Sequence, residues 1–431
     1  MNVSKNPTRV LIVGGGFAGL ASAARLAQSG VPVTLFESAA EVGRSASTLN
    51  QGWLHSGGAF ARSDVALAAA CYDALRRTTK FCPGCVEPPP ADGPAMNRMV
   101  YFARAGGADP TPWLDAWDRA GVPVRPLTAA DVARELSDLR PGVAGPAFGL
   151  PDRAFRPDAL LRKLTEVALA HGAEVRCGTP VRGLTIEDDA VRGVELPEGE
   201  TVRGGAVVLA TGAFNRDPVV TRIAGRPLPL PGGTSVGLHR THLVSCRAGL
   251  KSAPFHVLED GGLNALPHGS TTVFGSERWE EVASATAAVR PDPAEARRLW
   301  EQAEALLPAV RRDASGVREW AGVTAHAVRA SLGGDRGRAG AWSGPVLVNH
   351  GRAVPPIEGL YSVFPGRATM WAHAADIVRQ AALERIDPPH VVAAAPPWGA
   401  PESIPQTTGG ETDPAGQVDE AEGFEFVAPA P

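Results

Sequence analysis

The N-terminal segment alternates apolar runs and glycines in the order of a strand, a helix and a second strand. Arg9–Val13 is a β-branched run that ends in consecutive glycines, and a helical pattern follows over Ala18–Ser29. Gly30 ends that pattern, and Val31–Glu37 is a second apolar run. Short apolar runs on either side of one helix are typical of buried parallel strands. The segment therefore predicts a βαβ unit.

The same reasoning predicts helices and strands over most of the remaining chain. Val122–Leu136 reads as a strand and then a helix opening at Thr128, whose hydroxyl can cap the first amides. The other predicted helices are Arg62–Lys80, Pro157–Ala170, Pro291–Arg311 and Thr369–Leu383. The other predicted strands are Glu174–Cys177, Val191–Leu196, Ala206–Ala210, Gly359–Pro365 and the short, antiparallel Thr241–Cys246, Phe255–Leu258 and Thr271–Gly275.

Composition narrows the function classes. The 431 residues are 44% hydrophobic and 20% charged, with a formal net charge of −4. Those values are typical of a globular enzyme and give no basic surface for nucleic acid. The apolar stretch Val10–Ala27 contains consecutive glycines and Arg25, so we expect a buried element and no integral membrane segment. The first residues lack the apolar core of a signal peptide, so we expect a cytoplasmic protein.

Gly14, Gly16 and Gly19 form a G-x-G-x-x-G motif between the first strand and the first helix. In that context the motif predicts a dinucleotide site. The first glycine allows a tight turn, the second lets the backbone approach a pyrophosphate, and the third lets helix and strand pack closely. Phe17 and Ala18 open the helix, whose N-terminal amides would face the phosphates.

Glu37 ends the second strand, close to the ~20-residue offset at which an acid bonds a ribose hydroxyl. A carboxylate there repels a 2′-phosphate, so NADP is disfavoured as the ligand of this unit. The alternative is a βαβ unit with a glycine-rich turn and no ligand.

Three later stretches resemble the flavoproteins with two dinucleotide-binding domains. Gly43–Ser45 follows Glu37, Val207–Gly212 is a strand ending in Ala-Thr-Gly, and Tyr361–Thr369 matches the family's strand–Gly–helix element. The last element lays a helix N-terminus against the flavin ring, and Arg44 would lie near the phosphates or ribose. The resemblance implies FAD, not NAD, as the cofactor. The residues assigned to FAD are Gly14, Gly16, Phe17, Ala18, Gly19, Glu37, Arg44, Ser45, Asn50, Gln51, Gly52, Val181, Thr211, Gly212, Gly366, Arg367, Ala368 and Thr369.

Most of residues 8–385 is similar to the D-amino-acid oxidase/glycine oxidase superfamily, and more narrowly to its branch with glycerol-3-phosphate and L-2-hydroxyglutarate oxidases. The resemblance rests on Ser47–Gly58, Phe155–Leu161, Leu263–His268 and Pro365–Thr369. It implies an α/β, two-domain flavoprotein with a Rossmann-type FAD-binding domain and a substrate domain of antiparallel sheet plus helices, which roofs the flavin. The expected FAD-binding domain is residues 1–85, 150–225 and 335–387, and the substrate domain is residues 86–149 and 226–334.

The expected third part is a tail of residues 388–431, rich in Pro and Ala. It carries several Asp and Glu residues and no Lys or Arg, which predicts solvated chain. Trp398, Phe424 and Phe426 are exceptions that could pin the tail to a groove.

Two departures from the family bear on the substrate and the flavin. Amino-acid oxidases clamp the substrate carboxylate with a roof arginine, whereas the corresponding stretch Gly322–Arg329 offers His326 and Arg329. This disfavours an amino-acid substrate. No cysteine follows Gly366 at the position of the cysteinyl-flavin link of sarcosine oxidases.

Histidines are the candidates for proton chemistry. The flavin removes the hydride, and oxidation of an alcohol also needs a base for the hydroxyl proton, which near neutral pH is usually histidine. His55, which the resemblance places near the flavin, is the first candidate for base, substrate ligand or covalent anchor. The alternative is a histidine that only holds its loop. His268 and His326 are the further candidates, and the roof also carries His239, Arg240, His242 and His256.

We therefore expect an FAD-dependent oxidase or dehydrogenase that removes a hydride from a C–OH or C–NH carbon of a small molecule. Oxygen or an external acceptor would reoxidise the flavin, and an oligomer is compatible with the sequence. An origin in bacterial specialised metabolism fits the composition. The alternatives are an aromatic monooxygenase, whose Gly-Asp is replaced by Pro365-Gly366-Arg367, and a non-catalytic flavin-binding protein.

Cysteines give little further chemistry. Cys82 and Cys85 have C-x-x-C spacing, but no second pair follows, so we expect incidental loop cysteines. The histidine spacing predicts no metal site.

Overall fold

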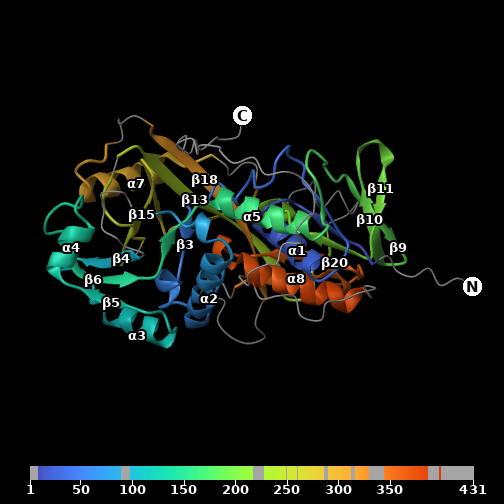
Figure 1. Ribbon diagram of the computed structural model, residues 1–431, viewed down its shortest axis with the longest axis horizontal. Coiled ribbons are helices and arrows are strands. Elements are labelled where there is room, and N and C mark those ends of the chain that lie inside the picture. The colour runs from blue at the N-terminus through green and yellow to red at the C-terminus, as the bar shows by residue number, and fades with distance from the viewer. Residues whose placement is uncertain are drawn as a thin grey trace, which may run out of the picture.

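A computed structural model describes residues 8–88, 98–216, 228–248, 250–259, 261–285, 290–311, 316–329, 344–386 and Trp398. The molecule is elongated, with one large sheet in each half (Figure 1). One half holds β20, α1, α5 and α8, and the other holds β4, β6, β15 and α7.

The first sheet has the order β19-β20-β12-β1-β2-β8. Its strands are β1 (Val10–Val13), β2 (Val33–Phe36), β8 (Glu174–Arg176), β12 (Ala206–Leu209), β19 (Val346–Asn349) and β20 (Leu360–Phe364). All neighbours are parallel except β19 and β20. Every residue of β1, β2 and β12 is buried, as in a parallel sheet covered on both faces.

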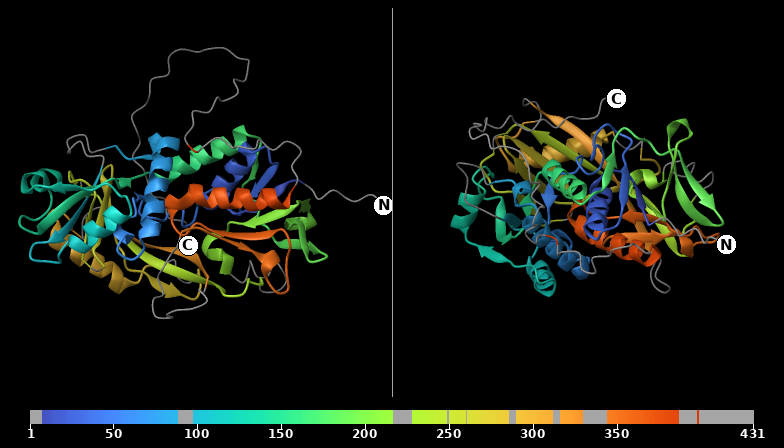
Figure 2. Two further views of the ribbon diagram at one scale, coloured as in Figure 1. Left: turned by 90° about the horizontal axis from the view of Figure 1, so that it is seen from below. Right: turned by 45° about the vertical axis from the view of Figure 1, so that its right-hand side comes forward.

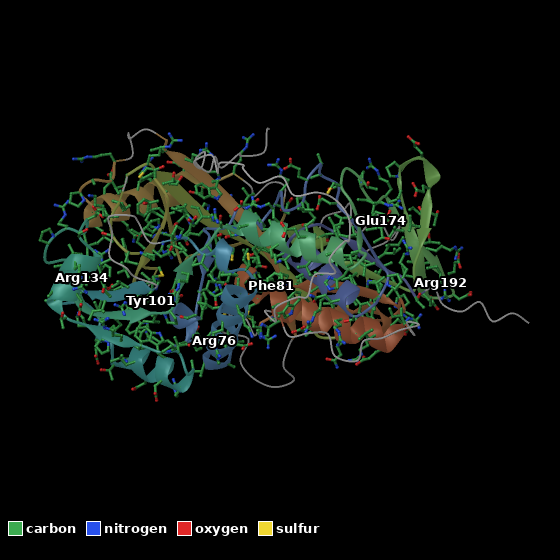
Figure 3. All side chains as sticks on the ribbon, viewed as in Figure 1. Arg76, Phe81, Tyr101, Arg134, Glu174 and Arg192 are labelled. Carbon is green, nitrogen blue, oxygen red and sulfur yellow. The ribbon has the colours of Figure 1, made fainter. Side chains whose placement is uncertain are left out.

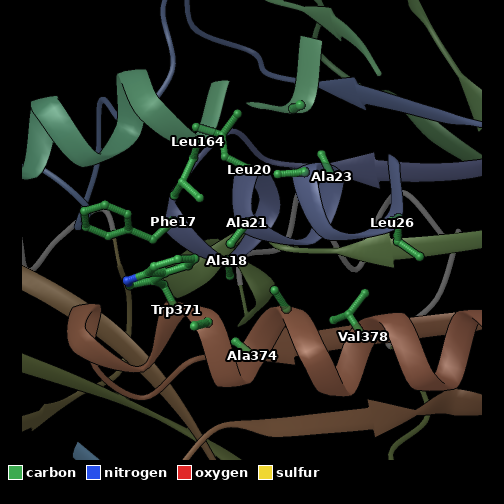
Figure 4. Close-up of a cluster of buried hydrophobic side chains, with 14 of the residues drawn as sticks. Phe17, Ala18, Leu20, Ala21, Ala23, Leu26, Leu164, Trp371, Ala374 and Val378 are labelled. Atoms are coloured by element: carbon green, nitrogen blue, oxygen red, sulfur yellow. The ribbon is translucent and has the colours of Figure 1, made fainter. Parts of the chain in front are cut away.

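One face of this sheet is covered by α1 (Phe17–Gln28), which packs between α5 (Pro157–Ala170) and α8 (Trp371–Arg385) (Figure 4). The alanines of α1 allow the close approach, with Trp371, Ala374 and Val378 of α8 on one side and Leu164 of α5 on the other. Arg25 Nε donates to Asp376 Oδ1 at 2.7 Å and ties α1 to α8. Figure 2 shows the same helices from below.

The opposite face is covered by a small antiparallel sheet. Its strands are β9 (Gly183–Glu187), β10 (Ala190–Glu195) and β11 (Thr201–Arg203). Leu184, Val191 and Val194 pack with Leu11 and Val207 of the large sheet.

The second large sheet has nine strands. They are β4 (Met99–Arg104), β5 (Arg125–Leu127), β6 (Ala144–Leu150), β13 (Thr234–Cys246), β14 (Phe255–Val257), β15 (Leu263–His268), β16 (Thr271–Ser276), β17 (Glu280–Val282) and β18 (Arg318–Arg329). The order is β17-β13-β16-β15-β14-β4-β6-β5, and β18 also pairs with β13. Its neighbouring strands are antiparallel, as expected, except that β4 and β14 run parallel.

α7 (Pro293–Leu306) covers one face of the nine-stranded sheet. Its Leu299 and Trp300 pack with Val244, Phe255 and Phe274. The remaining helices are α2 (Val65–Phe81), α3 (Thr111–Arg119) and α4 (Ala129–Glu135). The short elements are β3 (Trp53–Leu54), β7 (Arg153–Ala154) and the 3-10 turns η1 (Gly58–Phe60), η2 (Pro83–Cys85), η3 (Pro197–Gly199), η4 (Gly212–Arg216), η5 (His350–Arg352) and η6 (Ala368–Met370).

The predicted helices and strands are confirmed, with ends that differ by a few residues. Thr128 caps α4 in a capping box with Asp131. The final helix begins at Trp371, later than predicted, because a 3-10 turn precedes it. The strand predicted at Thr241–Cys246 begins earlier, at Thr234. The strands that were not predicted include β4, β6, β9, β11, β15, β17, β18 and β19, and the helix α3 was also missed.

Trp398 is the residue of the acidic tail that the structure describes, and it is buried. Its ring packs on Phe81 and Trp371, with ring centroids 5.2 and 4.7 Å away. The Arg25 guanidinium carbon lies 4.9 Å from the Trp398 ring. These contacts hold the Trp398 side chain, whereas Phe424 and Phe426 lie outside the described residues.

Candidate active site

The glycine motif turns the chain sharply at the carboxyl end of β1. Gly14 has a φ of +110°, and a Cβ on it would meet the Ala210 carbonyl oxygen at 2.5 Å. A Cβ on Gly19 would meet the Gly14 oxygen at 1.9 Å. Both positions therefore exclude a side chain. Gly16 precedes α1 and has no side chain to cap its first turn. The N-terminal amides of α1 therefore lie at an edge of the sheet that suits a pyrophosphate.

Glu37 stands at the neighbouring edge, after β2. Its Oε2 accepts from Gly15 N at 2.7 Å, and its Oε1 accepts from Ala39 N at 2.8 Å. Its carbonyl accepts from Thr179 N at 2.8 Å, two residues before the buried Val181. Oε1 also accepts from Ser38 Oγ at 3.2 Å, whereas Oε2 keeps a further lone pair that fits a ribose hydroxyl.

The loop after Glu37 folds over the N-terminus of α1. Ser47 Oγ accepts from Phe17 N at 3.0 Å, and Asn50 Oδ1 accepts from Gly52 N at 2.7 Å. Arg44 forms an ion pair with Glu41 at the surface. Exposed pairs of this kind are weak, so the Arg44 guanidinium is able to exchange Glu41 for a phosphate.

Two further loops reach the same edge from β12 and β20. Thr211 Cα would lie 3.3 Å from a Cβ on Gly14, and Gly212 has a φ of +57°. Gly366 has a φ of +72° and leads into η6, which joins α8. The loops at 14–19, 37–52 and 211–212 thus lie together, and the loop at 366–369 follows β20, the strand next to β12.

His55 lies where this edge meets the second sheet. Its backbone amide donates to Thr369 Oγ1 at 3.4 Å. Its ring packs against Trp53 and Phe60, with ring centroids 5.5 and 5.1 Å away. Within the part of the chain that the structure describes, the buried Nδ1 has no hydrogen-bond partner.

Arg367, which is partly buried, places a positive charge beside His55. Its guanidinium carbon lies 3.5 Å from the Phe60 ring centroid, a cation–π contact. Burial, and then the charge of Arg367, hold the pKa of His55 well below its ordinary value. His55 is therefore a neutral imidazole with a lone pair available to a ligand.

Asp152 fixes the backbone on both sides of His55. Its buried carboxylate accepts from the amide and hydroxyl of Ser56, and from Trp53 Nε1 and Tyr101 Oη at 3.0 Å each. Burial raises the Asp152 pKa, and the hydrogen bonds from Ser56 oppose that shift. The labelled Tyr101 in Figure 3 lies in the half that holds the nine-stranded sheet, so the network joins the two halves.

The nine-stranded sheet presents alternate residues to the two faces. On β13, Val244 packs under α7, whereas Leu243 lies near Gln51, because both approach Gly275. His242 and Arg240 share the face of Val244, and His239 shares the face of Leu243. The histidines of this sheet, the expected roof of the site, therefore lie on both of its faces. On the face opposite α7 are His239, His256, His268 and His326, and on the α7 face is His242.

His326 lies on the roof directly across from the loop after β20. Its Nε2 is 2.8 Å from Thr324 Oγ1, and its ring stacks on His239 at 4.9 Å. A Cβ on Gly366 would be 4.0 Å from His326 Nδ1. Burial, then the charges of His239 and Arg367, hold the pKa of His326 well below its ordinary value.

Both ring nitrogens of His268 have hydrogen-bond partners. Nε2 lies 2.9 Å from the Gln51 carbonyl oxygen, and Nδ1 lies 3.2 Å from Glu87 Oε1. A Cβ on Gly52 would collide with this ring at 2.5 Å. These contacts favour a role in holding the 51–52 loop over a role as base.

Cys82 and Cys85 are buried under the first sheet. A hydrogen bond from Cys85 lowers the Cys82 pKa to about 7. In the described ranges, no three His, Cys, Asp or Glu residues are grouped to bind a metal ion.

Sequence reasoning missed Asp152, Tyr101, Phe60 and Glu277. The signal for Asp152 is a carboxylate next to the apolar strand Ala144–Leu150, where an acid must be paired to be buried. No comparable signal marks Phe60 or Tyr101.

Comparisons with known proteins agree with this geometry. Residues 9–351 match the family model described as DAO, FAD dependent oxidoreductase. Subunit A1 of the anaerobic glycerol-3-phosphate dehydrogenase of Haloferax volcanii is 29% identical over 49% of this chain, which is 37% of that protein. A probable FAD-dependent oxidoreductase of Pseudomonas aeruginosa is 31% identical over 48% of this chain and 52% of that protein. The chain thus spans about half or less of these relatives.

Solved structures share the fold at low identity. L-proline dehydrogenase from P. horikoshii has a TM-score of 0.64 and 18% identity, over 89% of this chain and 96% of that one. The FAD-bound L-α-glycerophosphate oxidase of Mycoplasma pneumoniae has a TM-score of 0.65 and 15% identity, over 88% of this chain and 94% of that one.

No helix among the described residues is long and apolar enough to cross a membrane. The family match over most of the chain shows that this protein belongs to the FAD-dependent oxidoreductases of the DAO family.

Proposed function

We propose that this oxidoreductase removes a hydride from a C–OH or C–NH carbon of a small molecule. The observation that carries the proposal is the neutral His55, whose buried Nδ1 lies without a partner among the described residues, next to Arg367 and Thr369. A buried lone pair is costly unless it is satisfied, so the place suits a donor on a ligand.

The FAD-binding residues are proposed from the same geometry. The N-terminus of α1 and Arg44 would hold the pyrophosphate, Glu37 the ribose, and the loop at 366–369 the flavin end. FAD supplies the acceptor for the hydride when bound. We also propose the division into an FAD-binding domain (1–85, 150–225, 335–387) and a substrate domain (86–149, 226–334).

This chain's own residues would orient the substrate and exclude water. His55 accepts a hydrogen bond from a donor group of the substrate, and Arg367 supplies positive charge beside it. His326 and Thr324 cover the opposite side from β18. Near His326 this face of β18 carries Thr324 and Gly322, and Trp320 and the exposed Arg318 follow toward its other end.

An anaerobic screen tests the proposal. The purified yellow protein is mixed without oxygen with glycerol 3-phosphate, a 2-hydroxy acid, glycine, L-proline and a simple amine, and flavin absorbance is followed. Bleaching by at least one compound is expected. Bleaching only by NADH or NADPH would indicate a monooxygenase, and no bleaching by any of these would indicate a non-catalytic flavoprotein.

A further inference from the structure

His256 is a second buried imidazole on the roof. It lies on β14 between Phe255 and Val257, both of which pack toward α7, so its ring projects from the opposite face. The residue is 2% exposed. Its ring contacts Tyr101 at 4.9 Å and Trp53 at 5.7 Å between centroids.

A carboxylate orients this ring. His256 Nε2 lies 3.4 Å from Glu277 Oε1, just beyond the end of β16. A carboxylate beside Nε2 favours the tautomer that carries the proton there and leaves a lone pair on Nδ1. That Nδ1 is buried and has no hydrogen-bond partner within the described ranges.

The pair lies beside the candidate active site. Trp53 contacts His256 on one side and His55 on the other. The negative charge of Glu277 also reaches Arg367, whose own pKa is lowered by burial and raised in part by Cys71 and Glu277. Trp53 is anchored by Asp152, as is Tyr101, so both rings that hold His256 are fixed to the loop of His55.

We propose that His256, positioned by Glu277, is the base that accepts the substrate's hydroxyl or amine proton. The inference rests on the proposed function. The O–H or N–H bond breaks and its proton moves to Nδ1 of His256, the C–H hydrogen leaves with its electron pair for FAD, and a C=O or C=N bond forms. Glu277 balances the positive charge that the imidazole gains.

The contrast with His55 supports this assignment. Protonation of His55 would place a second positive charge beside Arg367 in a buried site, whereas protonation of His256 places it beside a carboxylate. A base works best when its protonated form is accessible near the operating pH. His256 therefore takes the reacting proton, and with an amine substrate, which has a second N–H, His55 accepts the remaining hydrogen bond.

A matched set of variants tests the base. His256→Gln should keep flavin content and melting temperature, yet reduce its flavin about 10² to 10⁴ times more slowly at saturating substrate. The substrate is the compound that bleaches the wild type fastest in the anaerobic screen. Glu277→Gln should be slowed less, and Glu277→Asp should recover part of the rate. His242→Gln is the control, because His242 faces Glu280 at 3.6 Å on the α7 face; it should react like the wild type.

A second readout needs no turnover. In protein labelled with ¹⁵N-histidine, the His256 signals, assigned by their loss in His256→Gln, should show the proton on Nε2. Glu277→Gln should weaken that preference. A wild-type proton on Nδ1, or full-speed flavin reduction in His256→Gln, would overturn the base assignment alone. If none of the screened substrates reduces the wild-type flavin, the proposed function is contradicted instead. In that case the position of the imidazole proton still tests whether Glu277 orients His256.

Discussion

Ser56 donates both its backbone amide and its hydroxyl to the buried carboxylate of Asp152. Because the same carboxylate accepts from Trp53 and Tyr101, one side chain fixes the loop of His55 against the nine-stranded sheet. Four donors satisfy a charge that burial would otherwise disfavour. The position of His55 therefore depends on a residue almost a hundred positions away in the sequence.

Asp152→Asn should destabilise the protein and slow flavin reduction together. The amide has one acceptor oxygen in place of two, so at least one buried donor loses its partner, at a cost of about 1–3 kcal/mol. Thermal unfolding and anaerobic flavin reduction measure the two effects. Asp138→Asn is the control: Asp138 accepts from Lys251 N and Ser252 N at 2.7 Å each, away from the site. It should lower stability alone, and equal slowing in both variants would contradict the positioning role.

FAD content should depend on the space at Gly16 and Gly19. Gly19→Ala forces a Cβ against the Gly14 oxygen, and Gly16→Val places a branched side chain at the α1 N-terminus beside Ser47 Oγ, 2.9 Å from a built Cβ. Both proteins should purify colourless, and Glu37→Ala should bind FAD more weakly. The ratio of flavin to protein absorbance measures this. Gly172→Ala, at a site with open space and a φ of +85°, should stay yellow. A yellow Gly16→Val protein would place the phosphates elsewhere.

These glycines show what local sequence determines. The contact at Gly19 is made within the motif, with the Gly14 oxygen, whereas Gly14 is confined by Ala210 and Thr211 after β12. The spacing of the motif predicted both glycine positions but did not show that distant partner. The roof could not be predicted in this way. β18 pairs with β13 from Thr234↔Arg329 to Ser245↔Arg318, across a long sequence separation, and only that pairing brings His326 onto His239. His268 was predicted as a candidate base from its place in the roof segment, because the sequence does not show that Gln51 and Glu87, from distant segments, contact both of its ring nitrogens.

Acid should destabilise the protein partly through His326 and His55. The folded-state pKa of each lies well below the ordinary value of 6.5. Their contribution is therefore present above that value and is lost as pH falls toward the folded-state pKa. His326→Gln removes one such group, so its melting temperature should fall less than the wild type's between about pH 7.5 and pH 5. Parallel curves for the two proteins would show that His326 is already charged in the fold.

Trp398 should contribute to stability. Trp398→Ala removes contacts with Phe81, Trp371 and Arg25, and large-to-small changes of buried aromatics cost about 3 kcal/mol. A chain ending at residue 387 should lose a similar amount, measured by thermal unfolding. Leu169→Ala, at a side chain that is 52% exposed, should change stability little. If truncation leaves the melting temperature unchanged, the Trp398 contacts are not stabilising.

The most direct test of the central claim is the anaerobic reduction of the flavin by one substrate in two isotopic forms. The substrate identified by the screen is prepared with hydrogen or deuterium on the carbon that bears the OH or NH, and mixed with the yellow protein without NADH, NADPH or oxygen. The account predicts that the flavin is bleached in a single turnover and that the deuterated form reacts several times more slowly, because the C–H bond breaks in that step. Hydride removal from the C–OH or C–NH carbon would be contradicted by bleaching that requires a nicotinamide nucleotide. It would also be contradicted if the hydrogen and deuterium forms of the substrate reduced the flavin at equal rates.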